Sequence, residues 1–175
     1  MKKLIIINGT MGVGKSSVAQ LLNKSIPNSA LVDGDWCCKI NSPLSDSIKN
    51  LYLKNINTLI NNYLSSDDVT DVILCWVIHK NEILQKILQN TDLRNVNVYV
   101  ITLQANEQTL TKRIIGRFEY EKRDKGELER SLFYQQNYYN DISSYKLDTS
   151  DMSIERVAEK IIQIISDEKY GFLLT

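Results

Sequence analysis

The sequence contains few cysteines, a single histidine and no excess of charge of either sign. Its three cysteines are too few for a disulfide framework, which favours a reducing compartment, and no Cys/His spacing suits a zinc site. Lysine plus arginine and aspartate plus glutamate number 21 each, so no net charge attracts nucleic acid or an anionic membrane. These absences argue against disulfide-stabilised secreted domains, zinc proteins and general nucleic-acid binders.

Long hydrophobic runs are absent as well. The first apolar run ends before Asn8, well short of the roughly 7–15 residues of a signal-peptide core. Nothing in the sequence approaches the roughly 20 apolar residues of a transmembrane helix. With 175 residues, 43% of them hydrophobic and 24% charged, the chain has the composition of a globular domain. We expect a cytoplasmic protein with one domain, residues 1–175, and no membrane partner.

One motif is specific: the segment Gly9-Thr10-Met11-Gly12-Val13-Gly14-Lys15-Ser16 matches the phosphate-binding pattern G-x-x-x-x-G-K-[ST] at every fixed position. Its glycines let successive backbone N–H groups point at an anion, and the following helix adds its positive end. In this pattern Lys15 reaches the β- and γ-phosphates, while the Ser16 hydroxyl takes a position on Mg²⁺. The motif therefore predicts binding of a nucleoside triphosphate. The predicted contacts are Gly9, Met11, Gly12, Val13, Gly14, Lys15, Ser16 and Ser17.

The rest of the chain alternates strand and helix patterns. Apolar runs predict strands at residues 4–7, 29–33, 72–78, 95–103 and 145–149. Helical spacing predicts helices between them, one of which starts at Ser42-Pro43, a capping serine followed by proline. This alternation implies a parallel sheet with right-handed crossovers, whose ligands bind beyond the carboxyl ends of the strands.

Two carboxylates follow the second predicted strand in Asp33-Gly34-Asp35. Beside a phosphate loop, one carboxylate can hold the metal through water while the other orients or deprotonates an acceptor hydroxyl. The alternative interpretation is a plain turn, because aspartate and glycine dominate turns. The position beyond a strand end favours the functional interpretation.

These features resemble the small-molecule kinases of the shikimate kinase, gluconate kinase and chloramphenicol phosphotransferase group. The resemblance implies a three-layer α/β P-loop NTPase fold with a five-stranded parallel sheet of order 2-3-1-4-5, nucleoside/shikimate kinase-like. It also implies ATP and Mg²⁺ as cofactors, with Ser16 and Asp33 serving the metal, and a lid at about residues 117–129. Asp33-Gly34-Asp35 is similar to the Asp-Gly-Asp of gluconate and adenylylsulfate kinases, but the following Trp36-Cys37-Cys38 departs from both. The acceptor of neither family therefore transfers to this chain.

Arginines after the fourth predicted strand are the next candidates that the resemblance supplies. It implies that Arg113 stacks on adenine and that Arg117 closes over the phosphates, with Arg123 as a weaker lid candidate. A movable cation can stabilise the charge that spreads over the equatorial oxygens during transfer. The alternative is a solvated helix surface of mixed charge. Thr149-Ser150, ahead of the last helix, matches the place where related kinases contact the adenine base.

Other residues around the predicted cleft narrow the options. The third strand runs into Cys75-Trp76-Val77-Ile78 without an aspartate, so the acidic metal-site residue common in motor and AAA-type ATPases is missing. His79 is a candidate base or a polar cap on the following helix. Trp36 and Trp76 are either apolar walls facing each other across the acceptor side or core residues.

The function predicted from the sequence is transfer of the γ-phosphoryl group of Mg-ATP to a hydroxyl of a small-molecule acceptor. Lys15, Asp33, Asp35 and Arg117 are the predicted catalytic residues. Alternatives are a nucleoside or nucleoside monophosphate kinase, and a nucleotide-binding regulator without transfer activity. A polynucleotide end kinase is disfavoured by the balanced charge. We expect a monomer or a homodimer.

Overall fold

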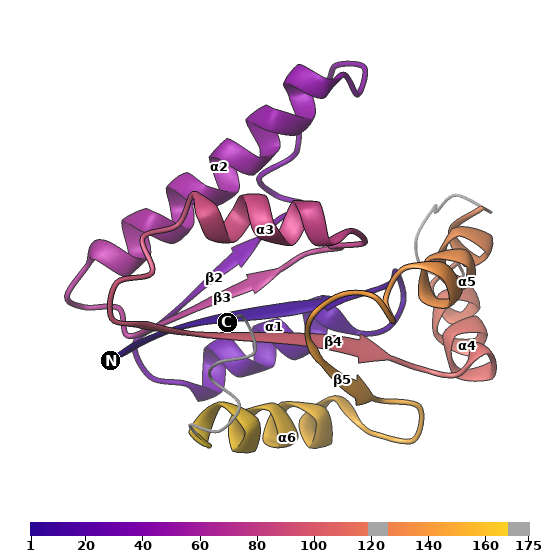
Figure 1. Cartoon of the computed structure of the whole chain (residues 1–175). Helices are drawn as coiled ribbons and strands as arrows, with labels where there is room; N and C mark the ends of the chain where they lie inside the picture. Colours follow the sequence, from indigo (N-terminus) through magenta and orange to yellow (C-terminus); the bar gives the residue numbers. More distant parts are fainter. Residues whose placement is uncertain (119–125, 168–175) are drawn as a thin grey trace.

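The computed structural model describes residues 1–118 and 126–167 (Figure 1). Within these residues the elements follow one another as β1 (Lys2–Gly9), α1 (Lys15–Ser25), β2 (Ser29–Asp33), α2 (Asp46–Ser65), β3 (Asp71–Cys75), α3 (Asn81–Gln89), β4 (Val96–Gln104), α4 (Glu107–Phe118), α5 (Glu127–Asn137), β5 (Tyr145–Asp148) and α6 (Ile154–Ser166). The strands form one five-stranded sheet of order β2-β3-β1-β4-β5, and every neighbouring pair is parallel. The predicted fold class is confirmed.

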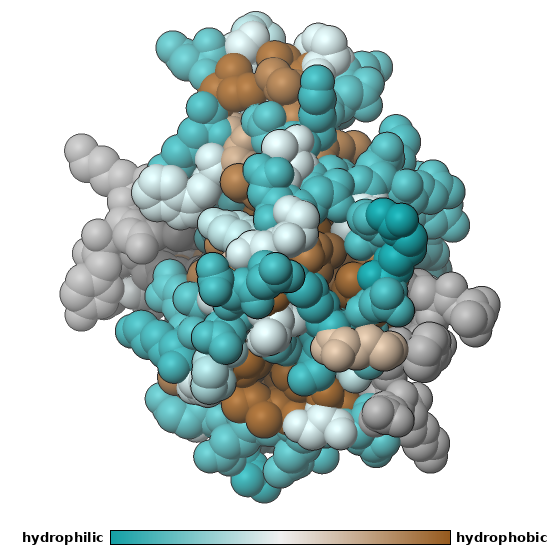
Figure 2. Space-filling view, turned by 90° about the vertical axis from the view of Figure 1, so that its left-hand side faces the viewer, coloured by the Kyte–Doolittle hydropathy of each residue, from teal (hydrophilic) through white to brown (hydrophobic). Residues whose placement is uncertain are grey.

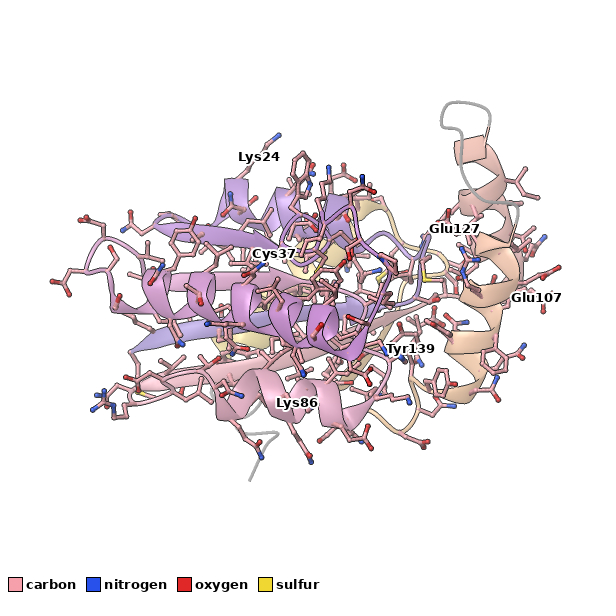
Figure 3. All side chains as sticks on the ribbon, turned by 90° about the horizontal axis from the view of Figure 1, so that it is seen from above. Lys24, Cys37, Lys86, Glu107, Glu127 and Tyr139 are labelled. Atoms are coloured by element: carbon pink, nitrogen blue, oxygen red, sulfur yellow. The ribbon has the colours of Figure 1, made fainter. Side chains whose placement is uncertain are left out.

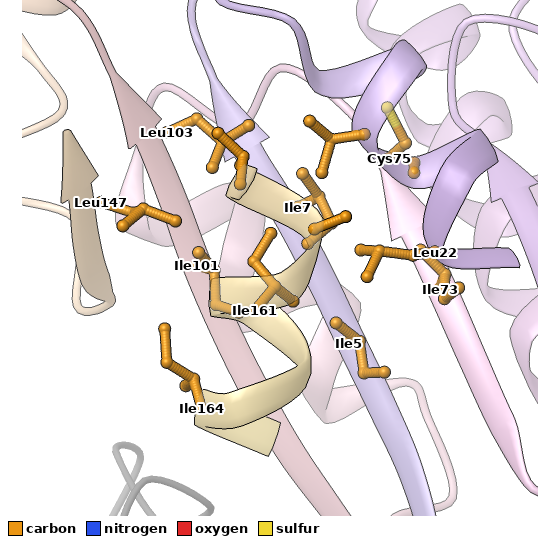
Figure 4. Packing of buried hydrophobic residues seen from close by; sticks show 14 of the residues in the cluster. Ile5, Ile7, Leu22, Ile73, Cys75, Ile101, Leu103, Leu147, Ile161 and Ile164 are labelled. Atoms are coloured by element: carbon orange, nitrogen blue, oxygen red, sulfur yellow. The ribbon is translucent and has the colours of Figure 1, made fainter. Parts of the chain in front are cut away.

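The central strand β1 feeds two hydrophobic cores, one on each face of the sheet. Side chains alternate along a strand, so Ile5 and Ile7 pack with α1 and α6, while Leu4 and Ile6 pack with α2 and α3. Figure 4 shows the first of these cores, with Ile161 of α6 lying over the strands. Burial on both faces explains why β1 is a continuous apolar run rather than an alternating one.

The helices cover the two faces of the sheet, and the candidate site lies at the edge where the strands end. Helices α2 and α3 cover one face, α1 and α6 cover the other, and α4 and α5 stand beyond the carboxyl end of β4 (Figure 1). Figure 2 views the opposite edge, where the strands begin, and hydrophilic side chains cover most of that face. In the part of the chain that the structure describes, no helix has both the length and the apolar character needed to cross a bilayer.

Helix α2 begins at Asp46, and the predicted start at Ser42-Pro43 is wrong. The hydroxyl of Ser45 accepts a hydrogen bond from the backbone N–H of Ile48 at 3.3 Å, which makes Ser45 the capping residue. The carbonyl of Pro43 instead accepts from the N–H of Ser45 in a preceding turn. A capping serine satisfies an orphan N–H of the first helical turn, and two nearby serines offered the same local signal.

Strand β3 ends at Cys75, so the prediction of a strand through residue 78 is wrong for the last three residues. The buried side chain of Asn8 explains this end. Its amide donates to the carbonyl of Ile78 at 2.9 Å, and its oxygen accepts from the N–H of Ile78 at 2.8 Å. The backbone N–H and C=O of Ile78 are thus paired with a side chain and not with a neighbouring strand, so the strand cannot continue there, while the buried polar groups remain satisfied.

The predicted lid at residues 117–129 overlaps two helices at its ends. Arg117 lies in the last turn of α4, and residues 127–129 form the first turn of α5. Residues 119–125, which include the lid candidate Arg123, lie outside the described residues. The lid therefore stays a prediction.

Candidate functional site

The phosphate-binding loop connects β1 to α1 and needs glycine where the backbone turns. Gly9 has φ 138° and Gly12 has φ 79°, a region that residues with a side chain rarely adopt. A Cβ atom on Gly9 would lie 2.5 Å from the carbonyl oxygen of Leu103, and one on Gly12 would lie 2.4 Å from Cγ1 of Ile114. Backbone strain and close packing both exclude other residues, so the loop holds its curled shape before any ligand arrives.

The only fixed cation of the motif is folded across this loop. Lys15 is 9% exposed, and its Nζ donates to the carbonyl oxygen of Thr10 at 2.9 Å. The loop thus holds the ammonium group close to the start of α1, where the helix dipole is positive and anions are favoured. The arrangement suits the binding of a phosphate group rather than an isolated structural role for the lysine.

The carboxylate pair after β2 forms a turn tied to the end of β3. The N–H of Asp35 donates to Oδ1 of Asp33 at 2.9 Å, and the N–H of Gly34 donates to the carbonyl of Cys75 at 2.9 Å. Asp33 is half-buried and Asp35 is exposed. The motif forms a turn, and this turn places two carboxylates at the carboxyl edge of the sheet; their catalytic role stays a prediction.

Cys75 is the point around which the predicted residues gather. Its Sγ lies 3.9 Å from Oγ of Ser16. Burial is the main cause that raises the pKa of the thiol, Lys15 lowers it, and Asp33 and Asp35 raise it, with a net value of about 11. Through Cys75 the structure thus brings the carboxylate turn beside Ser16 of the phosphate loop, two motifs that the sequence predicted separately. Cys75 itself was missed, because the sequence showed only that no aspartate stands there.

The oxygen donors at this point suit a magnesium ion that is completed by substrate. Mg²⁺ prefers oxygen ligands, keeps several waters and is bound by one or two protein groups together with phosphates. The Ser16 hydroxyl and the Asp33 carboxylate meet this description on chemistry. Among residues 1–118 and 126–167, no group of three or more histidine, cysteine, aspartate or glutamate side chains could hold a metal by itself.

The first testable prediction concerns the charge on Cys75. Because burial raises its pKa to about 11, the thiol should be neutral at pH 7.5 and should react slowly with iodoacetamide. Below the pKa the thiolate fraction, and hence the labelling rate, should rise about tenfold per pH unit. Mass spectrometry of the Cys75 peptide, with free cysteine as the reference, measures this rate. Labelling as fast as that of free cysteine at pH 7.5 would show that burial does not raise the pKa of Cys75 above that of a free thiol, and would contradict the prediction.

A hollow on the other side of the loop suits a nucleotide base. It has a volume of about 280 Å³ and is lined by Gly12, Val13, Gly14, Ser17, Val18, Arg113, Thr149, Met152, Ser153, Ile154 and Val157. The guanidinium of Arg113 donates to the carbonyls of Val13 at 3.0 Å and Thr149 at 2.8 Å. Arg113 therefore links the phosphate loop to the segment between β5 and α6 and forms a wall of the hollow. Its predicted stacking on adenine stays a prediction.

Helix α5 docks on the phosphate loop through a residue that the sequence did not reveal. Ser131 is fully buried, and its hydroxyl donates to the carbonyl of Met11 at 2.7 Å. The hydroxyl of Thr10 donates to the backbone carbonyl of Ser131 at 2.9 Å. Since the carbonyl of Thr10 holds Lys15, α5 and the lysine meet at the same loop residue. A lone serine within a polar helix carries no sequence signal for such a contact.

Ser131→Ala should therefore weaken the loop. Leaving a buried carbonyl without its donor costs about 1–3 kcal/mol, so we expect a loss of that order in the free energy of unfolding and weaker binding of an ATP analogue. Urea unfolding and calorimetric titration measure the two effects. Ser166→Ala is the matched control, because Ser166 is exposed at the end of α6 and its hydroxyl donates to the carbonyl of Ile162 in the same helix. Equal nucleotide affinity of Ser131→Ala and wild type would show that the contact does not support the loop.

The predicted role of His79 as a cap is wrong. Lys80 occupies the capping position of α3 and makes no side-chain capping bond, while the ring of His79 stacks on Tyr134 with centroids 5.0 Å apart. Burial, and to a lesser extent Lys80, lower the pKa of His79. The histidine is thus an aromatic packing partner of α5 that stays neutral at pH 7.

Comparison with known proteins agrees with this architecture. A sugar kinase from Janibacter sp. HTCC2649, solved without ligand, aligns with a TM-score of 0.73 at 16% identity and covers 95% of both chains. The tunicamycin resistance protein of Deinococcus radiodurans has a TM-score of 0.66 at 19% identity over 94% of this chain and 96% of its own. A gluconokinase from Sinorhizobium meliloti 1021 has a TM-score of 0.64 at 16% identity over 93% of this chain and 90% of its own. At these identities the likeness establishes the fold alone.

The sequence comparison with known families gives the assignment. No curated protein matches the chain. One family, described as AAA domain, matches residues 5–135, which include the phosphate loop, the carboxylate pair and most of α5. The match spans well over half of the chain. The resemblance to the small-molecule kinase group is confirmed at the level of the fold, and by sequence the chain belongs to the AAA-domain family.

Proposed function

We propose that this protein transfers the γ-phosphoryl group of Mg-ATP to a hydroxyl group of a small molecule, acting as a single domain over residues 1–175. The observation that carries the proposal is that the buried Cys75 contacts both Ser16 of the phosphate loop, at 3.9 Å, and Gly34 of the carboxylate turn, at 2.9 Å, at the carboxyl edge of the sheet. A phosphate-binding loop alone would serve any nucleoside triphosphatase. A carboxylate pair beside it supplies what transfer to an alcohol needs in addition.

The residues divide the work by position. Lys15 neutralises the phosphate oxygens as charge develops on them, and Ser16 with the half-buried Asp33 provides oxygen ligands for the magnesium that accompanies the nucleotide. Asp35 is exposed, so it can accept the proton of an incoming hydroxyl. When bound, Mg-ATP supplies the phosphoryl group and the metal charge that shields it.

A panel assay tests the proposal. The purified chain is incubated with Mg-ATP and single compounds from a set of alcohols, sugars, nucleosides and nucleoside monophosphates, and ATP consumption is compared with a water-only control. Strong stimulation by one compound, with a phosphorylated product in the mass spectrum, is the expected result. Stimulation by nucleosides or their monophosphates alone would favour the nucleoside kinase alternative. ATP binding without stimulation by any compound would favour a regulator without transfer activity.

We also propose that Arg117, in the last turn of α4, stabilises the transferring phosphoryl group. A contact made mainly in the transition state contributes to kcat more than to ground-state binding. Arg117→Ala should therefore lower kcat by more than it weakens the affinity for an ATP analogue. Arg156→Ala is the control, because Arg156 lies on the exposed face of α6. An unchanged kcat would leave Arg117 as a surface charge.

A further inference from the structure

The largest hollow beside the candidate site lies on the β2–β3 side of the phosphate loop. It has a volume of about 690 Å³, a size typical of small-molecule sites. Its walls come from the N-terminal half of α2, the segment after β3 and the first turns of α3, helices that lie side by side when seen from above (Figure 3). The hollow is separate from the one beside Arg113. Residues of the phosphate loop line the hollow beside Arg113 and not the larger one, which leaves the larger one for an acceptor.

Trp76 connects this hollow to the carboxylate pair. The ring lines the hollow and packs on Gly34, since a Cβ atom there would lie 2.3 Å from Cγ of Trp76. Gly34 stands between Asp33 and Asp35, so only the indole ring of Trp76 separates the hollow from the turn that carries the two carboxylates. Trp36, by contrast, is 70% exposed and is not a core residue. Of the two tryptophans, Trp76 is the one built into the acceptor side.

The walls of the hollow combine six apolar and aromatic side chains with seven polar or charged ones, Asn50 among them. The apolar and aromatic side chains are Leu44, Tyr52, Leu53, Trp76, Val77 and Ile83. Two of the charged residues that line the hollow form an ion pair: Nζ of Lys49 donates to Oδ1 of Asp46 at 2.9 Å. His79 at the inner end is held neutral by burial. The remaining charges, on Lys80, Glu82 and Lys86, include both signs.

The apolar side chains of this lining favour an aromatic ring over a polyol. A sugar carries a hydroxyl on nearly every carbon, and each hydroxyl that loses water against an apolar side chain goes without a partner. Leu44, Leu53 and Ile83 offer no such partner, whereas an aromatic ring gains from burial against leucine, isoleucine and indole surfaces. The chemistry of the hollow thus fits a ligand with a ring-sized apolar body and one hydroxyl that reaches toward Trp76.

Resting on the proposed function, we infer that the acceptor is an aromatic alcohol whose ring occupies the hollow lined by Tyr52, Leu53 and Ile83. Its hydroxyl passes the edge of Trp76 to reach the carboxylate pair. In the transfer step the acceptor oxygen forms a bond to the γ-phosphorus, and the bond from that phosphorus to the β,γ-bridging oxygen breaks. The hydroxyl proton moves to a carboxylate of the pair, and ADP carries away the bonding electrons.

Binding can be measured without any transfer. The sequence has two tryptophans, so Trp36→Phe leaves Trp76 as the only indole emitter, and the exposure of Trp36 makes this change mild for the fold. In the absence of ATP, 4-nitrobenzyl alcohol should quench this emission saturably, and 2-phenylethanol should relieve the quenching by competition. Glucose and glycerol should do neither. N-acetyltryptophanamide, which gives only linear collisional quenching, is the reference.

Variants of α2 locate the binding site. Leu53→Ala removes a wall of the hollow and should weaken binding of 4-nitrobenzyl alcohol about tenfold, in the range for lost apolar contacts in a pocket. Leu51→Ala is the matched control, because Leu51 lies on the same helix, is 41% exposed and does not line the hollow. Leu44→Ser is a second lining variant at a 64% exposed position, where the fold tolerates the change. Thermal unfolding checks each variant.

The outcomes separate this inference from the proposed function. Saturable binding that depends on Leu53, together with phosphorylation of an aromatic alcohol, supports both. Phosphorylation of a polyol, with no binding or reaction of aromatic alcohols, overturns the inference and leaves the kinase activity standing. Saturable, Leu53-dependent binding with no transfer to any compound supports the ligand class and overturns the proposed function. Linear quenching that Leu53→Ala does not change overturns the inference whatever the activity.

Discussion

Lys15→Ala should reduce phosphoryl transfer by at least about 10²–10³-fold while the chain remains folded. Lys15 is the only fixed cation of the phosphate loop, and it is held across the loop by the carbonyl of Thr10. In the proposed function the charge of Lys15 faces the phosphate groups, on which negative charge shifts during transfer. Removing Lys15 therefore weakens stabilisation of the transition state as well as binding of the nucleotide. Because the variant removes the donor to the buried carbonyl of Thr10, we expect a loss of about 1–3 kcal/mol in the free energy of unfolding.

The measurement is a steady-state assay of ADP formation with the acceptor found in the panel. Lys24→Ala is the matched control, because Lys24 lies in the last turn of the same helix, at the end far from the loop, and is exposed. Calorimetric titration with a non-hydrolysable ATP analogue and urea unfolding accompany the assay. Normal turnover of the Lys15 variant, with unchanged binding of the analogue, would show that the phosphate-loop assignment is wrong.

Asp33→Asn and Asp35→Asn should each lower kcat by about 10²–10⁴-fold, the range for loss of a positioned acid–base group. Asparagine keeps the size of the side chain and, at residue 33, an oxygen that can still accept from the N–H of Asp35. The turn should therefore persist while the charge is lost. Affinity for the nucleotide should change little, because the phosphate loop makes those contacts.

The two variants can also assign the roles within the pair. If Asp33 serves the metal, Asp33→Asn should raise the Mg²⁺ concentration needed for half-maximal rate, whereas Asp35→Asn should lower kcat without changing that concentration. Asp68→Asn, in the exposed loop ahead of β3 at the opposite edge of the sheet, is the control. Wild-type rates in both single variants would reduce Asp33-Gly34-Asp35 to a structural turn.

Local patterns predicted the elements that depend on neighbouring residues. The apolar run of β1, the glycines of the phosphate loop and the apolar face of α6 are all short-range signals, and each corresponds to the structure. The strand order 2-3-1-4-5 came from the resemblance to a kinase group, since periodicity does not say which strands are neighbours. One error was local as well: the sequence pattern placed the cap of α2 at Ser42, and the structure shows that Ser45 is the residue that accepts from Ile48.

The sequence by itself determined that the chain has a phosphate-binding loop, because the backbone geometry that an anion requires is encoded in Gly9, Gly12 and Gly14 with the following lysine. The tertiary structure decided what surrounds that loop. Asn8 ends β3 from 70 positions away, and Ser131 reaches Thr10 across 121 positions. The apolar hollow beside Trp76 likewise needs α2 and α3 to be packed. Such contacts depend on how the sheet brings distant segments together, and that arrangement leaves no periodic trace in the sequence.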